Sequence, residues 1–360
     1  MTPVRTPIVI RAGAQAAARI RADGIAPGDV AVVPAAAGGP KGLILHGLDC
    51  FVFGEWLPRA PRKRRLIGAS IGAWRMAAAL HPDPVGALTR LARLYAAQRY
   101  PPKPTAAYVT AVCRDLVDRV VGDAADAILA HPRHRLSVLP VRGRGPLAHA
   151  ETRRAETFGF ALAAAANAAG RARLARFLER VVFHDARDDV HWLGNRFDAF
   201  HTRFSPLSPA NLREALLASA SIPLVLDAVT EIAHAPAGAY WDGGIIDYHL
   251  HLPYPRAGGL VLYPHFVDHI VPGWLDKAFR GRRARGAWLD SVVLVAPSPE
   301  FIDGLPNRKL PDRGDFKRYR LDNEARIRDW NRAIGESGRL ADAFARWVER
   351  PDPSLVRSLG

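Results

Sequence analysis

The chain has 360 residues, of which 49% are hydrophobic, and it carries a formal net charge of +15 at neutral pH. This hydrophobic content excludes a disordered protein, and the length suffices for one large hydrophobic core or two modest ones. The positive charge favours anionic encounter partners, but the basic residues are scattered and follow no zinc-finger, RNP-type or basic-zipper pattern. We therefore expect no nucleic-acid partner.

The N-terminal segment MTPVRTPIVIRAGAQAAARIRADG contains no uninterrupted apolar run of the kind found in a signal peptide, and no stretch of the chain approaches a membrane span. We therefore expect a cytoplasmic protein. Cys50 and Cys113 both lie in apolar helical patterns. They are expected to be core thiols, not a disulfide or a metal pair.

The first third of the chain alternates between strand and helix patterns. Strands are predicted at 7–12, 29–36 and 66–70, and helices at 13–23, 41–57 and 71–80. Glycine-rich turns separate the second and third strands from the helices that follow them. This alternation is typical of a mainly parallel sheet with helices on its faces.

The rest of the chain is less regular. Residues 83–131 have helical periodicity, interrupted by the loop YPPKP, and form a candidate insert. Ser208 and Pro209 resemble the N-cap and first residue of a helix that stops at an Ile-Pro pair. Further strands are predicted at 135–145, 258–266 and 291–298, and further helices at 160–182 and from 321 onward.

The segment GASIG, from Gly68 to Gly72, fits the G-x-S-x-G pattern of a nucleophile elbow. The small flanking residues permit a sharp turn that presents Ser70 at the start of a helix. Five residues rich in Gly, Ala and Ser also fit an ordinary tight turn equally well. A catalytic Ser70 therefore needs a partner base and an oxyanion site.

The segment GGPKG, from Gly38 to Gly42, is a glycine turn that opens a helix. Backbone without side chains can approach a developing oxyanion and donate amides to it at the positive end of the helix dipole. The P-loop pattern is missing because Lys41 precedes Gly42 and no Ser or Thr follows, and G-x-G-x-x-G is missing too. Nucleotide binding is disfavoured, and no cofactor is predicted.

The segment YWDGGIIDYH places Asp242 before two glycines. A carboxylate in a glycine-rich turn can approach another backbone closely enough to serve as base or orienter for a serine. An Asp-Gly turn between strands explains the same segment.

Taken together, these segments resemble the patatin-like phospholipases. That family has a glycine-rich oxyanion loop ending in a basic residue and glycine, a G-x-S-x-G elbow and a later D-G-[GA], and GGPKG, GASIG and DGG occur here in that order. The segment ALLASASIPLVL is similar to the family's Ala/Ser-rich helix that leads to Ile-Pro. The resemblance covers residues from about 30 to 250.

The resemblance implies an α/β fold, with a mainly parallel central sheet flanked by helices in three layers. We expect a patatin-like catalytic domain over residues 1–300, with the helical insert at about 83–131 and a helical extension packed on it over 301–360.

The resemblance also implies lipid acyl hydrolase activity through a Ser/Asp dyad without a catalytic histidine. By position, Ser70 is the nucleophile and Asp242 its base. The oxyanion loop would comprise Gly38, Gly39 and Lys41, and the elbow glycines are Gly68 and Gly72.

Two positions depart from the family pattern. The loop often begins with a glycine where this chain has Ala37, which is tolerable only if that backbone needs no positive φ. Pro40 has no amide to donate, so the donors must come from Gly38, Gly39 and Lys41.

Two other functions remain open. A Ser-His-Asp hydrolase also uses G-x-S-x-G, and four histidines follow Asp242, but the H-G-G-G-type loop is missing. These histidines are His249, His251, His265 and His269. A non-catalytic module that binds lipid or another partner on the same scaffold is the second alternative.

We expect the substrate to be an acyl lipid or another carboxylic ester, cleaved through an acyl-enzyme. Trp74 and the helices of residues 83–131 either shape an acyl pocket or simply belong to the core. The basic run at 62–65 is expected to face an anionic membrane. His265, Asp268 and His269 are interpreted as ordinary side chains, and no metal is predicted.

Overall fold

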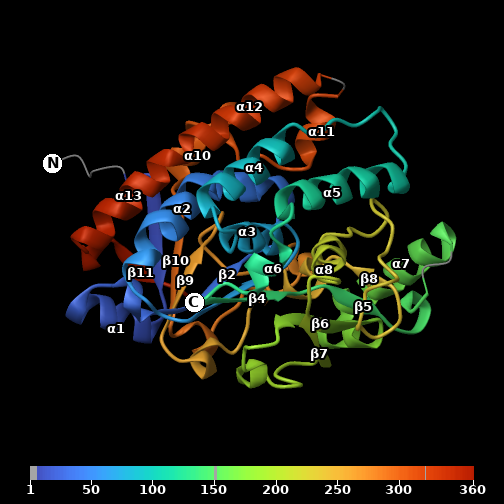
Figure 1. Cartoon of the computed structure of the whole chain (residues 1–360), viewed down its shortest axis with the longest axis horizontal. Helices are drawn as coiled ribbons and strands as arrows, with labels where there is room; N and C mark the ends of the chain where they lie inside the picture. Colours follow the sequence, from blue (N-terminus) through green and yellow to red (C-terminus); the bar gives the residue numbers. More distant parts are fainter. Residues whose placement is uncertain (1–5, 150–151, 321) are drawn as a thin grey trace.

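The computed structural model describes residues 6–149, 152–320 and 322–360. Within these ranges an 11-stranded sheet runs through the middle of the molecule, with helices packed against it (Figure 1). The strands are β1 (Ile8–Ala12), β2 (Val30–Ala35), β3 (Arg64–Gly68), β4 (His134–Val138), β5 (Val141–Gly143), β6 (Leu178–Asp185), β7 (Thr202–Leu207), β8 (Tyr240–Trp241), β9 (Leu260–Pro264), β10 (Val292–Pro297) and β11 (Val356–Ser358).

The middle of the sheet is parallel. Strands β10, β9, β2, β3 and β4 lie side by side in that order, and each pair runs parallel. On one side β1 is antiparallel to β10 and pairs with β11 at the edge. On the other side β6, β5 and β8 continue the sheet in antiparallel pairs, and β7 pairs with β6. The predicted α/β class with a mainly parallel sheet is confirmed.

The helices above the sheet in Figure 1 form one continuous cover, in which α13 packs on α2, α3 on α4, and α12 on α4. The helix α1 packs against β1, β10 and β11. The helices are α1 (Ala14–Asp23), α2 (His46–Phe51), α3 (Ile71–Ala79), α4 (Pro84–Ala96), α5 (Ala106–Val121), α6 (Ala125–Leu129), α7 (Arg153–Ala169), α8 (Leu212–Ser219), α9 (Gly244–Asp247), α10 (Pro299–Asp303), α11 (Gly314–Arg318), α12 (Asn323–Glu336) and α13 (Gly338–Glu349).

The central strands are hydrophobic without alternation because both of their faces are covered. Every residue of β2, β9 and β10 is buried. The carboxyl ends of β2 and β3 lie at the same edge of the sheet, since these neighbouring strands are parallel. The glycine loop follows β2 and the GASIG turn follows β3, so the topology brings the two motifs together, as is usual for ligand sites in such sheets.

Several boundaries differ from the sequence prediction. The helix predicted for 160–182 ends at Ala169, and its last residues form the start of β6. Gly170 caps α7, so the chain turns before the apolar residues that had extended the helical pattern. The segment predicted as one strand at 135–145 is two strands, β4 and β5.

The start of α8 was also predicted wrongly. The helix begins at Leu212 with Asn211 as its N-cap, not at Pro209 after Ser208. The Asn211 side chain accepts a hydrogen bond from the Ser208 amide at 2.8 Å, so Asn211 closes the turn that precedes the helix. The segment predicted as a helix at 41–57 begins instead as a 3-10 helix at Gly39–Leu45, which α2 continues.

The basic run at 62–65 does not form the expected exposed patch. Arg64 is 1% exposed and donates hydrogen bonds to the carbonyls of Pro27 and Ala60. Arg65 pairs with Asp188 at 2.9 Å. The run lies at the amino end of β3, whereas Ser70 follows its carboxyl end. The burial of Arg64 and the pairing of Arg65 count against the expectation that this run faces a membrane.

In the part of the chain that the structure describes, no helix combines the length and the apolarity needed to cross a membrane. Cys113 is buried and Cys50 half-buried, and both are free thiols, as predicted. The C-terminal region is helical through α12 and α13, and it ends in β11, a strand that was not predicted.

Candidate active site

Ser70 occupies the turn between β3 and α3. Its φ of 56° and ψ of −134° are unusual for a residue with a side chain. Such backbone strain costs about 1–3 kcal/mol and is retained at functional sites because the surroundings enforce it. The turn also requires Gly72, because a Cβ there would lie 2.0 Å from the carbonyl oxygen of Ala35 in β2. GASIG therefore has the geometry of a nucleophile elbow.

The Ser70 side chain meets Asp242, although 172 positions separate them in the sequence. Ser70 Oγ donates a hydrogen bond to Asp242 Oδ2 at 2.8 Å, and the two residues are 3% and 7% exposed. The second carboxylate oxygen, Oδ1, accepts the Gly244 amide at 2.7 Å. Asp242 is thus fixed on one oxygen by its own turn and offers the other to the serine.

Burial is the main influence on the Asp242 carboxyl, and it raises the pKa of that group above the ordinary value. The positive charge of Arg313 and the hydrogen bonds from Ser70 and Gly244 oppose this shift. A carboxylate with a raised pKa is a stronger base for a serine proton, provided that it remains ionised at the working pH.

Ser219, at the end of α8, supports the elbow. Its Oγ accepts the Ser70 amide at 2.9 Å and donates to the carbonyl of Leu139 at 2.8 Å. Its own carbonyl accepts the Gly243 amide at 3.0 Å. Ser219 therefore joins the GASIG turn to the DGG turn. It belongs to the segment ALLASAS, but sequence reasoning did not single it out.

The glycine loop lies beside the serine. Gly39 has a φ of 56°, which favours glycine, and it lines the same cavity as Ser70. Among the described residues no acceptor binds the amides of Gly38 and Gly39. The Lys41 amide instead donates to the Gly38 carbonyl at 3.4 Å. The two glycines thus offer free donors, whereas the predicted Lys41 amide is used within the turn.

The two departures from the family pattern leave this loop intact. Ala37 is not among the residues with positive φ, and its amide donates to the Tyr248 carbonyl at 2.9 Å. Pro40 occupies the start of the 3-10 helix, where its missing amide costs no hydrogen bond within the helix.

A cavity of about 650 Å³, here called the apolar cavity, opens on one side of Ser70. This volume is within the range of about 300–1,000 Å³ that is usual for ligand pockets. The helices α3, α4 and α5 contribute part of its wall, with the side chains of Trp74, Tyr95, Val109 and Cys113. Trp74 and the insert helices therefore line a cavity at Ser70, in agreement with the pocket alternative.

A second cavity of about 440 Å³, here called the cationic cavity, adjoins Asp242. Lys41, Lys277 and Arg313 line it, and within the described residues none of the three is ion-paired with a carboxylate. Arg313 also lines the apolar cavity, so the two cavities meet near the Ser70–Asp242 pair. Sequence reasoning missed Lys277 and Arg313.

Aromatic rings, not carboxylates, hold the lysines of the cationic cavity. Lys277 Nζ lies 4.0 Å from the centre of the Tyr248 ring, and Lys41 Nζ lies 5.4 Å from that of Phe266. Partial burial, followed by repulsion from Lys41 and Arg313, lowers the pKa of Lys277 to about 7. Three cations therefore share the cavity with two acids, Asp242 and Asp312, which oppose the lowering of the Lys277 pKa.

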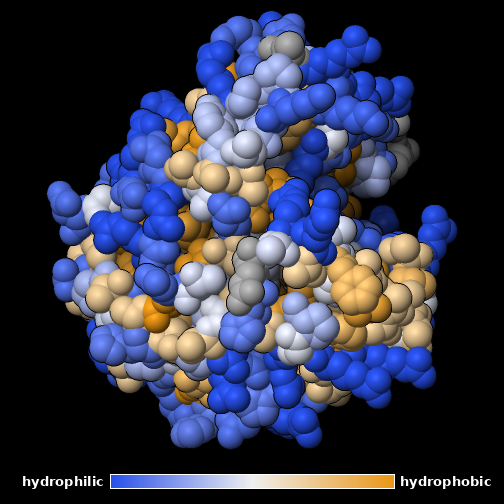
Figure 2. All heavy atoms as spheres, turned by 90° about the vertical axis from the view of Figure 1, so that its right-hand side faces the viewer, coloured by the Kyte–Doolittle hydropathy of each residue, from blue (hydrophilic) through white to orange (hydrophobic). Residues whose placement is uncertain are grey.

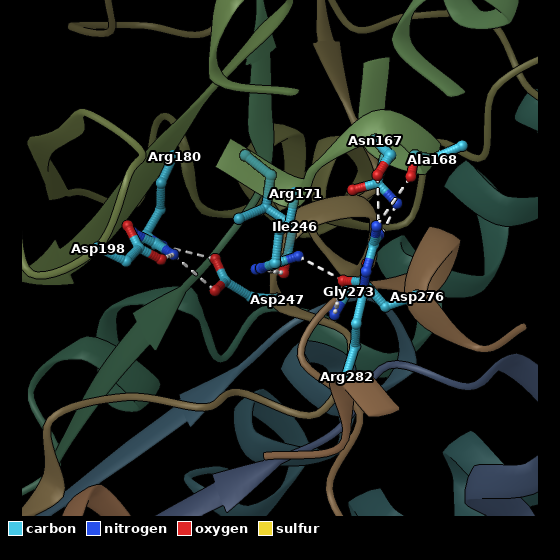
Figure 3. A network of polar contacts seen from close by, with 10 residues as sticks. All are labelled: Asn167, Ala168, Arg171, Arg180, Asp198, Ile246, Asp247, Gly273, Asp276 and Arg282. Atoms are coloured by element: carbon cyan, nitrogen blue, oxygen red, sulfur yellow. Dashed lines mark hydrogen bonds and ion pairs between the residues drawn. The ribbon is translucent and has the colours of Figure 1, made fainter. Parts of the chain in front are cut away.

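A buried polar network fixes the segments that carry Asp242 and Lys277 (Figure 3). Asp276, which precedes Lys277, is 1% exposed and accepts hydrogen bonds from the side chains of Asn167, Arg171 and Arg282. Arg171 also donates to the Ile246 carbonyl in α9.

The other half of the network anchors the end of α9. Arg180 donates to both oxygens of Asp247, at 2.6 and 2.9 Å, and to Asp198 at 2.8 Å (Figure 3). Because α9 follows Asp242 directly, this pair holds the DGG turn against the sheet. Breaking such a buried pair costs about 3–5 kcal/mol.

The histidines lie outside this arrangement. His249 Nδ1 accepts the Val271 amide, and His269 contacts Asp268. In the ranges that the structure covers, neither the Ser70 nor the Asp242 side chain has a histidine partner. The same ranges contain no group of three or more His, Cys, Asp or Glu side chains arranged to hold a metal ion.

Comparison with known proteins agrees with this geometry. The family model described as patatin-like phospholipase matches residues 45–249, more than half of the chain. The matched range includes Ser70 and Asp242, and the glycine loop lies just before it. No curated protein was found to match the chain. The match over this share of the sequence shows that the chain belongs to the patatin-like phospholipase family.

Proposed function

We propose that this protein is a serine lipid acyl hydrolase that cleaves carboxylic esters with Ser70 and Asp242. Membership in the family implies lipid acyl hydrolase activity. The observation that carries the residue assignment is the 2.8 Å hydrogen bond from Ser70 Oγ to Asp242 Oδ2, formed beside free loop amides and an apolar cavity.

The proposed reaction has two halves. Asp242 takes the proton of Ser70 as Oγ attacks the ester carbonyl, and the amides of Gly38 and Gly39 bind the oxyanion. When the intermediate collapses, the ester C–O bond breaks and Asp242 gives the proton to the leaving alcohol. Water then attacks the acyl-enzyme with Asp242 as base, which releases the fatty acid and restores Ser70.

The apolar cavity is the proposed site of the acyl chain. Ser70 lines it, and its wall includes the apolar side chains of Trp74, Val109 and Cys113. An acyl chain bound there removes apolar surface from water, which contributes about 25 cal/mol for each Å² buried.

The Ser-His-Asp alternative has less support, because Asp242 contacts Ser70 directly and no histidine of the described chain bonds to either side chain. A protein that only binds lipid or another partner would have no use for the strained backbone of Ser70. The two alternatives differ from our proposal in what single substitutions do.

The test is hydrolysis of a series of p-nitrophenyl esters from butyrate to palmitate by purified protein. We expect Ser70→Ala and Asp242→Asn to abolish activity while circular dichroism shows a folded protein. Ser208→Ala, a matched serine away from the site, and His269→Ala should retain activity. Activity that survives in a folded Ser70→Ala, or that is lost in His269→Ala, would contradict the proposal.

We further propose that the substrate enters from an anionic membrane surface at the mouth of the apolar cavity. Tyr108 and Val225 are 45% and 44% exposed, and Val225 lines this cavity together with Lys317 and Arg320. Figure 2 shows the side of the molecule with α5, α7 and α8, where hydrophobic atoms are exposed among charged ones. Such a surface suits a peripheral protein of the cytoplasm.

Vesicle flotation tests this surface. We expect stronger binding to phosphatidylglycerol vesicles than to phosphatidylcholine vesicles at low salt, and weaker binding for Val225→Glu. Val85→Glu is the matched control, since Val85 is 41% exposed and lines neither cavity. Equal binding to both vesicles, or equal losses in both variants, would contradict this proposal.

A further inference from the structure

The ring of Tyr95, in the last turn of α4, is held from two sides at the wall of the apolar cavity. It lies 6.3 Å from the Trp74 ring of α3 and stacks at 6.4 Å on the Trp330 ring of α12. Trp74 donates to the Leu216 carbonyl at 2.9 Å. Trp330 donates to Asp315 at 2.9 Å. Since α4 also packs against α3 and α12 (Figure 1), the orientation of the Tyr95 ring is set before any ligand enters.

The hydroxyl of Tyr95 is not explained by this packing. Within residues 6–149, 152–320 and 322–360 it has no hydrogen-bond partner. A buried tyrosine usually finds a partner for its hydroxyl, and a phenylalanine would fill the space between the two tryptophans equally well. The hydroxyl therefore points to a ligand that is absent from the free protein.

The same hydroxyl lies against the glycine loop. A Cβ built on Gly39 would stand 3.4 Å from Tyr95 Oη and 3.3 Å from Arg313 Nε. Gly39, Tyr95 and Arg313 line the apolar cavity together with Ser70. The space that a side chain at position 39 would fill is thus left open beside the nucleophile, and a hydroxyl donor and a guanidinium border it.

We propose that Tyr95 is a catalytic residue whose hydroxyl donates a hydrogen bond to the oxyanion that forms when Ser70 attacks the ester carbonyl. It adds a side-chain donor to the amides of Gly38 and Gly39. This inference rests on the proposed function, because the oxyanion arises only if Ser70 is acylated.

The surroundings of Tyr95 suit a donor that keeps its proton. Burial raises the pKa of its hydroxyl, and the positive charge of Arg313 opposes this shift only in part. The hydroxyl is therefore neutral at physiological pH and can donate without transferring its proton. Because the ring is already held in place, the donor needs no rearrangement as the negative charge develops.

Residues outside the family match complete this arrangement. The match covers residues 45–249, and both Arg313 and Trp330 follow it. Trp330 is a positioning residue, because it acts through the Tyr95 ring. On this proposal, the C-terminal region supplies the ring that supports the donor and the cation beside it.

The first experiment compares Tyr95→Phe with Tyr319→Phe, using p-nitrophenyl butyrate. We expect Tyr95→Phe to lower kcat about 10²-fold at nearly unchanged KM, as for the loss of one oxyanion donor. Its Tm should not fall, because the hydroxyl bonds to nothing in the free protein. Tyr319 lines neither cavity and its hydroxyl contacts Asp329 and Asn307, so the control should lose Tm but keep kcat.

The outcomes separate this inference from the proposed function. If the enzyme is active and depends on Ser70, a Tyr95→Phe variant within threefold of the wild-type kcat would overturn the role of Tyr95 alone. A loss of kcat that accompanies an equal loss of folded protein would overturn it as well. A wild type that hydrolyses no ester would contradict the proposed function and this inference together.

The second experiment measures the bound oxyanion without turnover. A decyl trifluoromethyl ketone adds to an activated serine: the Oγ–C bond forms, Asp242 takes the proton, and the carbonyl oxygen becomes an oxyanion. Calorimetric titration should show that Tyr95→Phe weakens this ketone about 10²-fold, and decyl methyl ketone, which stays a neutral carbonyl, far less. Equal weakening of both ketones would show that Tyr95 only shapes the cavity, and would overturn the proposal.

Discussion

The two cavities that meet at Ser70 differ in origin as well as in chemistry. The apolar cavity takes about half of its lining from residues 70–113, which contain and follow the GASIG serine, and most of the rest from residues 220–226 and 313–323. The cationic cavity adds Lys277, which follows Asp242 by 35 positions, and shares Arg313 with the apolar cavity. The comparison teaches that one continuous region after GASIG supplies much of the apolar lining, whereas the cationic lining comes from short turns spread along the chain.

The largest effect is expected where the two regions meet. Gly39→Ala places a side chain on a backbone with a φ of 56° and brings its Cβ to 3.3 Å from Arg313 Nε. We expect this to displace the oxyanion donors and to lower kcat for anionic and neutral esters alike by about 10²–10³-fold.

The control for Gly39→Ala is Gly122→Ala. Gly122 has a φ of 51°, and an added Cβ meets no atom within 4 Å, so this variant carries similar backbone strain away from the site. It should lose stability but keep its activity per folded molecule. If kcat of the Gly39→Ala enzyme stayed within threefold of the wild-type value, the glycine loop would not supply the oxyanion donors.

A smaller effect should be confined to the acyl side. Cys113→Trp places a large ring in the wall of the apolar cavity from α5. We expect kcat/KM for a palmitoyl ester to fall about 10- to 200-fold, and that for a butyryl ester to fall far less, because only the long chain reaches this wall. Ala111→Trp, on the exposed face of the same helix, is the matched control. Equal losses for long and short esters would show that the acyl chain lies elsewhere.

The smallest effect concerns the cationic cavity and its pH dependence. Burial lowers the pKa of Lys277 to about 7, so this lysine is positively charged below pH 7 and increasingly neutral above it. The charged groups that face Lys277 are Lys41 and Arg313, which lower its pKa further, and Asp242 and Asp312, which raise it. His249 lies nearby, and burial lowers its pKa so far that it stays neutral.

The ratio of kcat/KM for dihexanoylphosphatidylglycerol to that for dihexanoylglycerol isolates this titration. Both reactions need ionised Asp242, so its raised pKa affects both alike and cancels in the ratio. A phosphodiester keeps its charge over this range. We therefore expect the ratio to fall by up to about tenfold as the pH rises from 6 to 8. In Lys277→Gln the ratio should not depend on pH. A flat ratio in the wild type would show that Lys277 does not act on the anionic group.

Much of this organisation could be predicted from the sequence because short motifs fix local backbone geometry. Ser70 requires small neighbours for its strained turn, and an Asp-Gly-Gly turn lets Asp242 approach it. The alternating strands and helices then place both glycine loops at one edge of the sheet. The central strands could be identified as continuous apolar runs because both faces of these strands are buried.

What could not be predicted depends on distant packing. Lys277 and Arg313 lie in irregular turns without any motif, and only the folded chain brings them beside Asp242. The strand β6 was interpreted as the end of a helix because its apolar residues follow the alanine-rich pattern of α7. The basic run that contains Arg64 and Arg65 resembles a surface segment in the sequence. In the structure Arg64 donates to a backbone carbonyl and Arg65 pairs with Asp188.

The most direct test of the account is covalent labelling of Ser70. An alkyl fluorophosphonate, which reacts with an activated serine, should give one adduct on the peptide that contains Ser70, as located by mass spectrometry. The Asp242→Asn protein should react at least about 10²-fold more slowly, because the serine has lost its base. An adduct on another residue, or equally fast labelling of a folded Asp242→Asn protein, would contradict the central claim that Asp242 activates Ser70 as the nucleophile.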